Sequence, residues 1–216
     1  FIAKTYEVQK DKNWEVNLKD LESKIDEKTR FIVVSNPAYP SGAVFSESHL
    51  KEIIEVAKRY KIPIVSDEVY ADFVFPGNRF ISLPSISGEV PVVQIAGAMK
   101  QYCLPGWNIS WIVFYDRVGA FKKFIPAFQN VMQLMLHPAP YLQFTIPDML
   151  ERANKNKLPN LMVKIKENHD LICSTLESKL GKFFEVCKAQ GGESLIAMLK
   201  LEAFKDITSE EDFAKK

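Results

Sequence analysis

The sequence contains few cysteines and no pattern that would use them together. There are three, Cys103, Cys173 and Cys187, and they form neither a C-x-x-C pair nor an even set for disulfides. The three histidines are equally scattered, whereas a structural zinc site needs about four Cys or His ligands at short spacing. We therefore expect no metal site and a reducing, cytoplasmic setting.

The sequence also lacks an excess of charge and a long hydrophobic run. Its 28 Lys and Arg against 27 Asp and Glu give a formal net charge of +1, whereas a nucleic-acid binder usually carries a clear basic excess. No stretch approaches the roughly 18 uncharged apolar residues of a membrane span. The first residues also lack the basic segment and apolar stretch of a signal peptide. We expect neither nucleic acid nor membrane as a partner.

What is present is typical of a folded α/β protein. The 216 residues are 47% hydrophobic, with 15 Phe, and four short apolar runs predict strands at 31–35, 62–66, 92–96 and 109–115. Apolar residues at helical spacing predict a helix from Ser46 or Ser48 to about Tyr60, with the serine as its N-cap. Strands that are apolar on both faces, with a helix between them, indicate a mostly parallel sheet covered by helices.

The second half of the chain has a different pattern. It predicts helices over 118–135, 140–156 and 158–180, then a strand over 194–201. A capping box from Thr208 to Glu211 opens a last helix, which stops after five more residues and is marginal alone. We therefore expect an excerpt of a longer protein, with one domain in 1–150 and a long linking helix and the start of a smaller α+β domain in 151–216.

Polar residues follow three of the predicted strands. The first is followed by Asn36, the second ends in Asp67 with Tyr70 close behind, and the third is followed by Lys100. Ligands of α/β sheets bind beyond the carboxyl ends of the strands, so these side chains are expected to converge. A carboxylate and a lysine placed there suit a cationic heteroaromatic cofactor and a Schiff base.

Three motifs around these residues carry a family resemblance. The segments 35–42 (SNPAYPSG), 66–70 (SDEVY) and 100–107 (KQYCLPGW) resemble the class I/II aminotransferases of fold type I, which depend on pyridoxal 5′-phosphate (PLP), with the tyrosine aminotransferase branch closest. The resemblance implies a seven-stranded type of sheet with helices on both faces, of which this chain is about half. It makes 1–150 part of the PLP-binding large domain.

The resemblance also implies roles for single residues. Lys100 forms the Schiff base with PLP and then moves the proton between the substrate α-carbon and the cofactor, Asp67 faces the pyridine nitrogen, and Tyr70 donates to the 3′-oxygen. An unperturbed lysine has a pKa of about 10.4, so we expect the site to favour the neutral amine. Taken singly, each residue also has a structural reading: a capping aspartate, a packed tyrosine and a solvated lysine.

The sequence departs from the family pattern at four positions. Eight residues after Lys100, where the family usually has an arginine on the cofactor phosphate, stands Asn108. Tyr39 replaces an amide expected near the 3′-oxygen, Met99 replaces a small residue, and Ser110 replaces a glycine or alanine. A neutral amide binds a phosphate less well than a guanidinium does. We therefore expect weakened PLP binding, or a relative that has lost catalysis.

The resemblance leads to one main functional hypothesis. It predicts an aminotransferase that takes tyrosine or another aromatic L-amino acid, with 2-oxoglutarate as amino acceptor, and that works as a homodimer when intact. The phosphate-binding loop and the carboxylate-binding arginine of the family are not found in these residues, so the partial chain is expected to be inactive alone. Two alternatives stay open: a cofactor-free relative kept for interactions, and a PLP lyase of the same fold.

Overall fold

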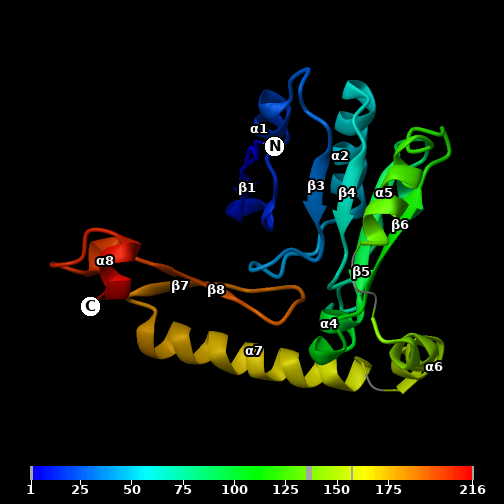
Figure 1. Ribbon diagram of the computed structural model, residues 1–216. Helices are drawn as coiled ribbons and strands as arrows, with labels where there is room; N and C mark the ends of the chain where they lie inside the picture. Colours follow the sequence, from blue (N-terminus) through cyan, green and yellow to red (C-terminus); the bar gives the residue numbers. More distant parts are fainter. Residues whose placement is uncertain (1, 135–137, 157, 216) are drawn as a thin grey trace.

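A four-stranded sheet forms the centre of the first half of the chain. The computed structural model describes residues 2–134, 138–156 and 158–215. Its main sheet has the order β3-β4-β5-β6, in which the first three strands are parallel and the last is antiparallel (Figure 1). The strands are β3 (Ile32–Ser35), β4 (Ile64–Asp67), β5 (Val92–Gly97) and β6 (Ser110–Tyr115). The predicted α/β class with a mostly parallel sheet is confirmed.

The helix α2 (Glu47–Tyr60) covers one face of this sheet (Figure 1). The Ser46 side chain accepts a hydrogen bond from the His49 N–H, so of the two serines that the sequence offered, Ser46 is the N-cap. The apolar stripe of α2, which includes Leu50, packs into the same core cluster as Val34 of β3. Burial of these side chains is the main favourable contribution to the stability of this layer.

The other face of the sheet is covered differently. Val33 shares this face with Val65, Val93 and Phe114 through the strand register, and its side chain is 48% exposed. The strand β3 is therefore buried on one face, not on both as its apolar run indicated. Over β6, the helix α5 (Phe124–Met132) packs its rings on Phe114. Helices thus lie on both faces of the sheet.

The residues before the sheet form elements that the sequence did not reveal. A two-residue ladder joins β1 (Val8–Gln9) to β2 (Glu15–Val16) around the short helix η1 (Lys10–Lys12). The helix α1 (Leu18–Lys24) follows, with the Asn17 side chain as its N-cap. Such short elements have no periodicity long enough to detect.

Long helices dominate the second half. The predicted helices at 140–156 and 158–180 are confirmed as α6 (Pro140–Asn156) and α7 (Leu158–Leu180). The helix predicted over 118–135 is shorter, Phe124–Met132. It begins late because the Asp116 carboxylate accepts hydrogen bonds from two backbone N–H groups and holds a turn there. Position 135 lies outside the described residues. The predicted boundary at residue 150 falls inside α6, and the division into domains stays a prediction.

A small antiparallel sheet follows α7. It pairs β7 (Phe184–Cys187), which the sequence did not reveal, with β8 (Ile196–Leu199), a shorter form of the strand expected over 194–201. The last helix, α8 (Glu210–Lys215), is capped by Ser209, whose hydroxyl accepts from the Asp212 N–H. The predicted cap at Thr208 was therefore one residue too early.

Short helical segments complete the chain. They are α3 (Leu83–Ile86), α4 (Ala98–Gln101), η2 (Pro105–Trp107) and η3 (Leu201–Ala203). Among the described helices, none combines the length and the apolar character needed to cross a membrane. Nor do the described residues place three or more His, Cys, Asp or Glu side chains where they could hold a metal ion.

The α2 face of the sheet supports a stability prediction. Leu50 is fully buried, and we expect Leu50→Ala to lower the free energy of unfolding by about 2–5 kcal/mol, because it removes buried methyl groups and leaves a cavity. Leu171 is exposed on α7, so Leu171→Ala is expected to change stability by less than about 0.5 kcal/mol. Urea denaturation of the two variants measures both, and equal losses would contradict this description of the core.

Candidate functional site

The parallel strands bring the predicted polar residues to one edge of the sheet. In the strand register, Ser35 lies opposite Asp67 and Asp67 lies opposite Ile95. The carboxyl ends of β3, β4 and β5 are therefore neighbours, and α4, which carries Lys100, begins directly after β5. The convergence expected from the sequence is present at the level of the backbone.

Three side chains meet at this edge. The Lys100 Nζ lies 2.5 Å from the Glu193 Oε1 and 5.6 Å from the centroid of the Tyr70 ring. The Tyr70 hydroxyl donates to the same Glu193 oxygen at 2.9 Å. We call these residues the Lys100–Tyr70–Glu193 triad.

The charges in the triad stabilise one another. The Glu193 carboxylate raises the pKa of the Lys100 amine, and the Tyr70 hydroxyl adds to this effect. In return, the Lys100 ammonium lowers the pKa of Glu193, while burial raises the pKa of the Tyr70 phenol. In this arrangement the Glu193 carboxylate therefore favours the ammonium form of Lys100. The neutral amine was expected beside a cationic cofactor ring, and that expectation stays a prediction.

Glycines hold the segment that brings Glu193 to the lysine. The Gly42 carbonyl accepts hydrogen bonds from the Gln190 and Gly191 N–H groups, and the Phe73 carbonyl accepts from Gly192. A Cβ added at Gly191 would lie 2.3 Å from the Phe73 oxygen, and one at Gly42 would lie 2.4 Å from the Gly191 oxygen. Only glycine permits this approach of two backbones, which we call the glycine clamp.

Tyr39 lies beside the triad. Its ring is nearly parallel to that of Tyr70, with an interplanar angle of 6° and centroids 6.4 Å apart, and its side chain is 65% exposed. Tyr39, one of the four departures from the family pattern, therefore lies at the site. It places a second phenol there instead of the amide that the family pattern has.

Asp67 lies at the same edge but is bonded elsewhere. Its Oδ1 accepts a hydrogen bond from the Val69 N–H at 3.3 Å, so it stabilises the turn that leads to Tyr70. The carboxylate is half-buried. This turn is a structural role of the kind that the sequence left open beside the functional one.

Asn108 lies outside the triad, and the backbone conformation at this position favours asparagine. It ends η2 in the left-handed region, with φ 48° and ψ 44°, and is exposed. Asparagine adopts this conformation more readily than most residues do. The other two departures, Met99 and Ser110, are also exposed.

Glu68, which the sequence analysis missed, anchors the end of β4. Its side chain is 1% exposed, and its two carboxylate oxygens accept four hydrogen bonds of 2.6–2.9 Å. The donors are the hydroxyls of Ser66 and Ser82, the Leu83 N–H and the Gln94 side-chain amide. A buried carboxylate needs such a complete set of partners. It ties the strand that carries Asp67 to β5 and α3.

Asn36 holds an unused donor at the end of β3. Its Oδ1 accepts a hydrogen bond from the Phe45 N–H at 2.9 Å, and the residue is almost fully buried. Its Nδ2 has no hydrogen-bond partner, and it is the one buried side-chain N or O atom of the described residues in that state. A buried donor of this kind is costly unless a ligand or water uses it.

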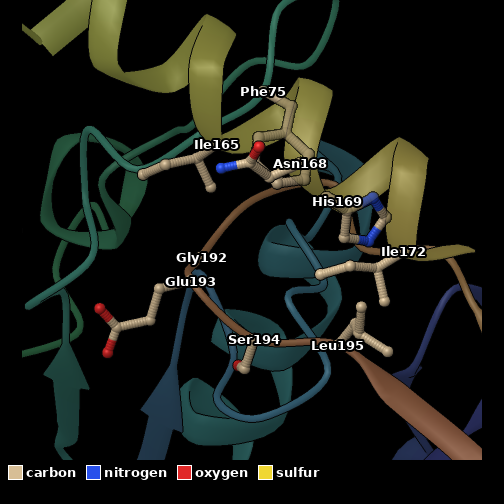
Figure 2. A pocket seen from close by; sticks show the side chains of 9 residues that line it. All are labelled: Phe75, Ile165, Asn168, His169, Ile172, Gly192, Glu193, Ser194 and Leu195. Carbon is tan, nitrogen blue, oxygen red and sulfur yellow. The ribbon is translucent and has the colours of Figure 1, made fainter.

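A cavity of about 480 Å³ adjoins the triad. Figure 2 shows Ile165, His169 and Ile172 of α7 facing the chain at 192–195, while the Glu193 side chain extends away from them. The His169 Nε2 accepts a hydrogen bond from the Ala189 N–H at 3.1 Å. This histidine therefore helps α7 to hold the segment that carries Glu193.

Comparison with known proteins shows the family of the chain. The family model for aminotransferase class I and II matches residues 2–216. The chain belongs to the class I and II aminotransferase family. This family depends on PLP, and the resemblance inferred from the three motifs is confirmed.

Individual relatives refine the placement within the family. The chain is 34% identical over 214 residues to the tyrosine aminotransferase of Bos taurus, covering 99% of this chain and 47% of that protein. It is 33% identical over 218 residues to an S-alkyl-thiohydroximate lyase of Arabidopsis thaliana, covering 99% and 46%. The chain thus spans about half the length of these curated relatives.

A solved structure shows the same fold. The tyrosine aminotransferase of Leishmania infantum superimposes with a TM-score of 0.91 at 24% identity, over 98% of this chain and 52% of that one. The four-stranded sheet, the long α7 and the β7–β8 pair therefore belong to the aminotransferase fold.

The described residues fit one end of PLP better than the other. An amine, a phenol, a carboxylate and the unused Asn36 amide at one sheet edge suit an aldehyde on a pyridine ring. At the phosphate end, the position that the family pattern gives to an arginine holds the neutral, exposed Asn108. The donor set therefore fits the ring and the aldehyde and provides no cation at position 108.

The hydrogen bonds of Glu68 support a second prediction. We expect Glu68→Ala to lower the free energy of unfolding by at least about 2 kcal/mol, because it leaves buried donors such as the Leu83 N–H unpaired. Glu68→Gln keeps one carbonyl acceptor and is expected to lose less. Glu55 is exposed on α2, so Glu55→Ala is the matched control, with a change of less than about 0.5 kcal/mol. Urea denaturation measures these changes. Equal losses of unfolding free energy in Glu68→Ala and Glu55→Ala would contradict the anchoring role.

Proposed function

We propose that the protein containing this chain is a PLP-dependent aminotransferase that uses tyrosine or another aromatic L-amino acid, with 2-oxoglutarate as amino acceptor. The observation that carries the proposal is the position of Lys100, beside Tyr70 at the carboxyl edge of the sheet, in a member of the aminotransferase family. The identity to a tyrosine aminotransferase supports the aromatic substrate.

Lys100, Asp67 and Tyr70 would each have a separate role in the reaction. PLP, when bound, supplies an electron sink for the transfer of an amino group. Lys100 would hold the cofactor through its amine and later carry the proton at the substrate α-carbon. Asp67 would keep the pyridine nitrogen protonated through its negative charge. The Tyr70 hydroxyl would donate a hydrogen bond to the ring oxygen.

The assembly and location of the intact protein are also proposals. We propose a homodimer in the cytoplasm, as the family resemblance and the sparse, unpaired cysteines predicted. In this proposal, the arginine that binds the substrate carboxylate comes from outside these residues, so the partial chain would be inactive alone.

A lyase is the second candidate function. It is favoured by the Arabidopsis thaliana S-alkyl-thiohydroximate lyase, which is nearly as similar to this chain as the bovine aminotransferase is. The two functions differ in one requirement, because an aminotransferase needs a 2-oxo acid acceptor for repeated turnover and a lyase does not. Turnover measured with and without 2-oxoglutarate distinguishes them.

The cofactor proposal is tested by absorbance. We expect PLP mixed with the full-length protein to give a visible absorption band that is lost in Lys100→Ala, because the amine of this lysine binds the aldehyde. The matched control is Lys10→Ala, which removes a lysine that is ion-paired with Glu185 and with no residue of the triad and is expected to keep the band. No band at saturating PLP would overturn the proposal in favour of a cofactor-free relative.

The neutral residue at position 108 supports a further prediction. We expect Asn108→Arg to tighten PLP binding about tenfold, because a charged hydrogen bond replaces a neutral one. The same change is expected to lower stability by about 1 kcal/mol, since arginine is strained in the left-handed conformation found there. PLP titration and thermal unfolding measure the two effects. Unchanged PLP affinity would show that residue 108 does not reach the phosphate.

A further inference from the structure

Glu193 is placed where it controls the most important amine of the site. Its Oε1 lies 2.5 Å from the Lys100 Nζ and accepts from the Tyr70 hydroxyl at 2.9 Å. The glycine clamp fixes the backbone just before it. The carboxylate is thus oriented by a phenol on one side and by a rigid chain on the other, which distinguishes it from a mobile surface charge.

We infer that Glu193 is a built-in counter-ion that holds Lys100 as an ammonium and has to release it before the amine reacts with an aldehyde. The inference rests on the proposed function, in which Lys100 is the lysine that binds the cofactor. Glu193 is a positioning residue in this scheme, because it acts through Lys100.

The chemistry of amines supports this role. A lysine nitrogen attacks a carbonyl only as the neutral amine, so the ammonium first loses a proton to solvent. A short, charge-assisted bond to a carboxylate stabilises the ammonium and thereby lowers the fraction of neutral amine at a given pH. The opposite arrangement, a lysine with a lowered pKa, is how enzymes usually activate this nucleophile.

Two titratable groups interact electrostatically with the Lys100–Glu193 pair, namely Tyr70 and Cys103. Asp72, which lies near Tyr102, contributes to raising the pKa of that phenol to about 12, after burial. Burial raises the pKa of the Cys103 thiol, and Glu193 adds to the effect. Neither Asp72 nor Tyr102 contributes to the pKa shift of Lys100 or of Glu193. The carboxylate that contacts the Lys100 nitrogen is that of Glu193.

The test measures the reactivity of Lys100 without PLP. Trace acetylation with acetic anhydride, quantified at Lys100 by peptide mass spectrometry from about pH 7 to about pH 11, reports the neutral amine. We expect Glu193→Gln, which keeps the shape and removes the charge, to react about threefold to tenfold faster in the lower part of this range. Its pH profile is expected to shift to lower pH. A rate within twofold of the wild type, with an unchanged profile, would overturn the inference.

The chain offers a matched control for charge removal. Glu185 is also half-exposed and lies 2.6 Å from a lysine, Lys10, in an ion pair that contains no residue of the triad. Glu185→Gln is expected to speed acetylation of Lys10 and to leave Lys100 unchanged. Glu193→Asp, which keeps the charge, is expected to stay closer to the wild type than Glu193→Gln does. Faster acetylation of Lys100 in Glu185→Gln would contradict a local counter-ion.

Two further measurements keep the outcomes separate. If acetylation of Lys100 accelerates in Glu193→Gln but PLP leaves no borohydride-trapped adduct on Lys100 in either protein, the counter-ion is supported and the proposed function fails. If PLP adds to Lys100 while acetylation is unaffected by the substitution, the counter-ion alone is overturned.

If Glu193→Gln does not fold, the wild type is acetylated at low salt and at about 1 M salt, where screening is expected to speed the reaction at Lys100. No salt effect would overturn the inference.

Discussion

The parallel register of three strands is the constraint on which the site depends. The strands β3, β4 and β5 are adjacent and run in the same direction, so their carboxyl ends form one edge of the sheet. Asn36, Asp67 and α4 lie at this edge because each stands at the end of one of these strands. The buried carboxylate of Glu68 fixes that edge from within, since its four donors come from β4, β5 and the chain around α3. The chemistry of the site is thus placed by backbone hydrogen bonds and secured by one buried acid.

Local patterns in the sequence were sufficient for the main sheet and the long helices. Continuous apolar runs identified the four strands, and the Ser46 cap with its apolar stripe identified α2. The same reasoning missed β7 and the β1–β2 ladder, because a strand of two to four residues has too few positions to show a period. It also described β3 as buried on both faces, since an apolar run does not reveal which side has a partner.

The candidate site was predictable only in part. Asp67, Tyr70 and Lys100 stood in recognisable motifs next to strand ends, and the structure places them at one edge. Glu193 was not predictable, because it is 93 residues from Lys100 in the sequence and nothing in its local pattern marks it as a partner. Two glycines before it were the available signal, but a pair of glycines usually indicates only a turn.

The glycine clamp links two distant parts of the chain through backbone atoms alone. Any side chain at Gly42 or Gly191 would push the two segments apart, and the carboxylate two residues beyond Gly191 would move with them. The acid–base behaviour of a lysine is therefore sensitive to steric bulk at positions that carry no ionisable group. Among related proteins, the exchange of either glycine for alanine would change the protonation of this amine, although every charged residue stayed in place.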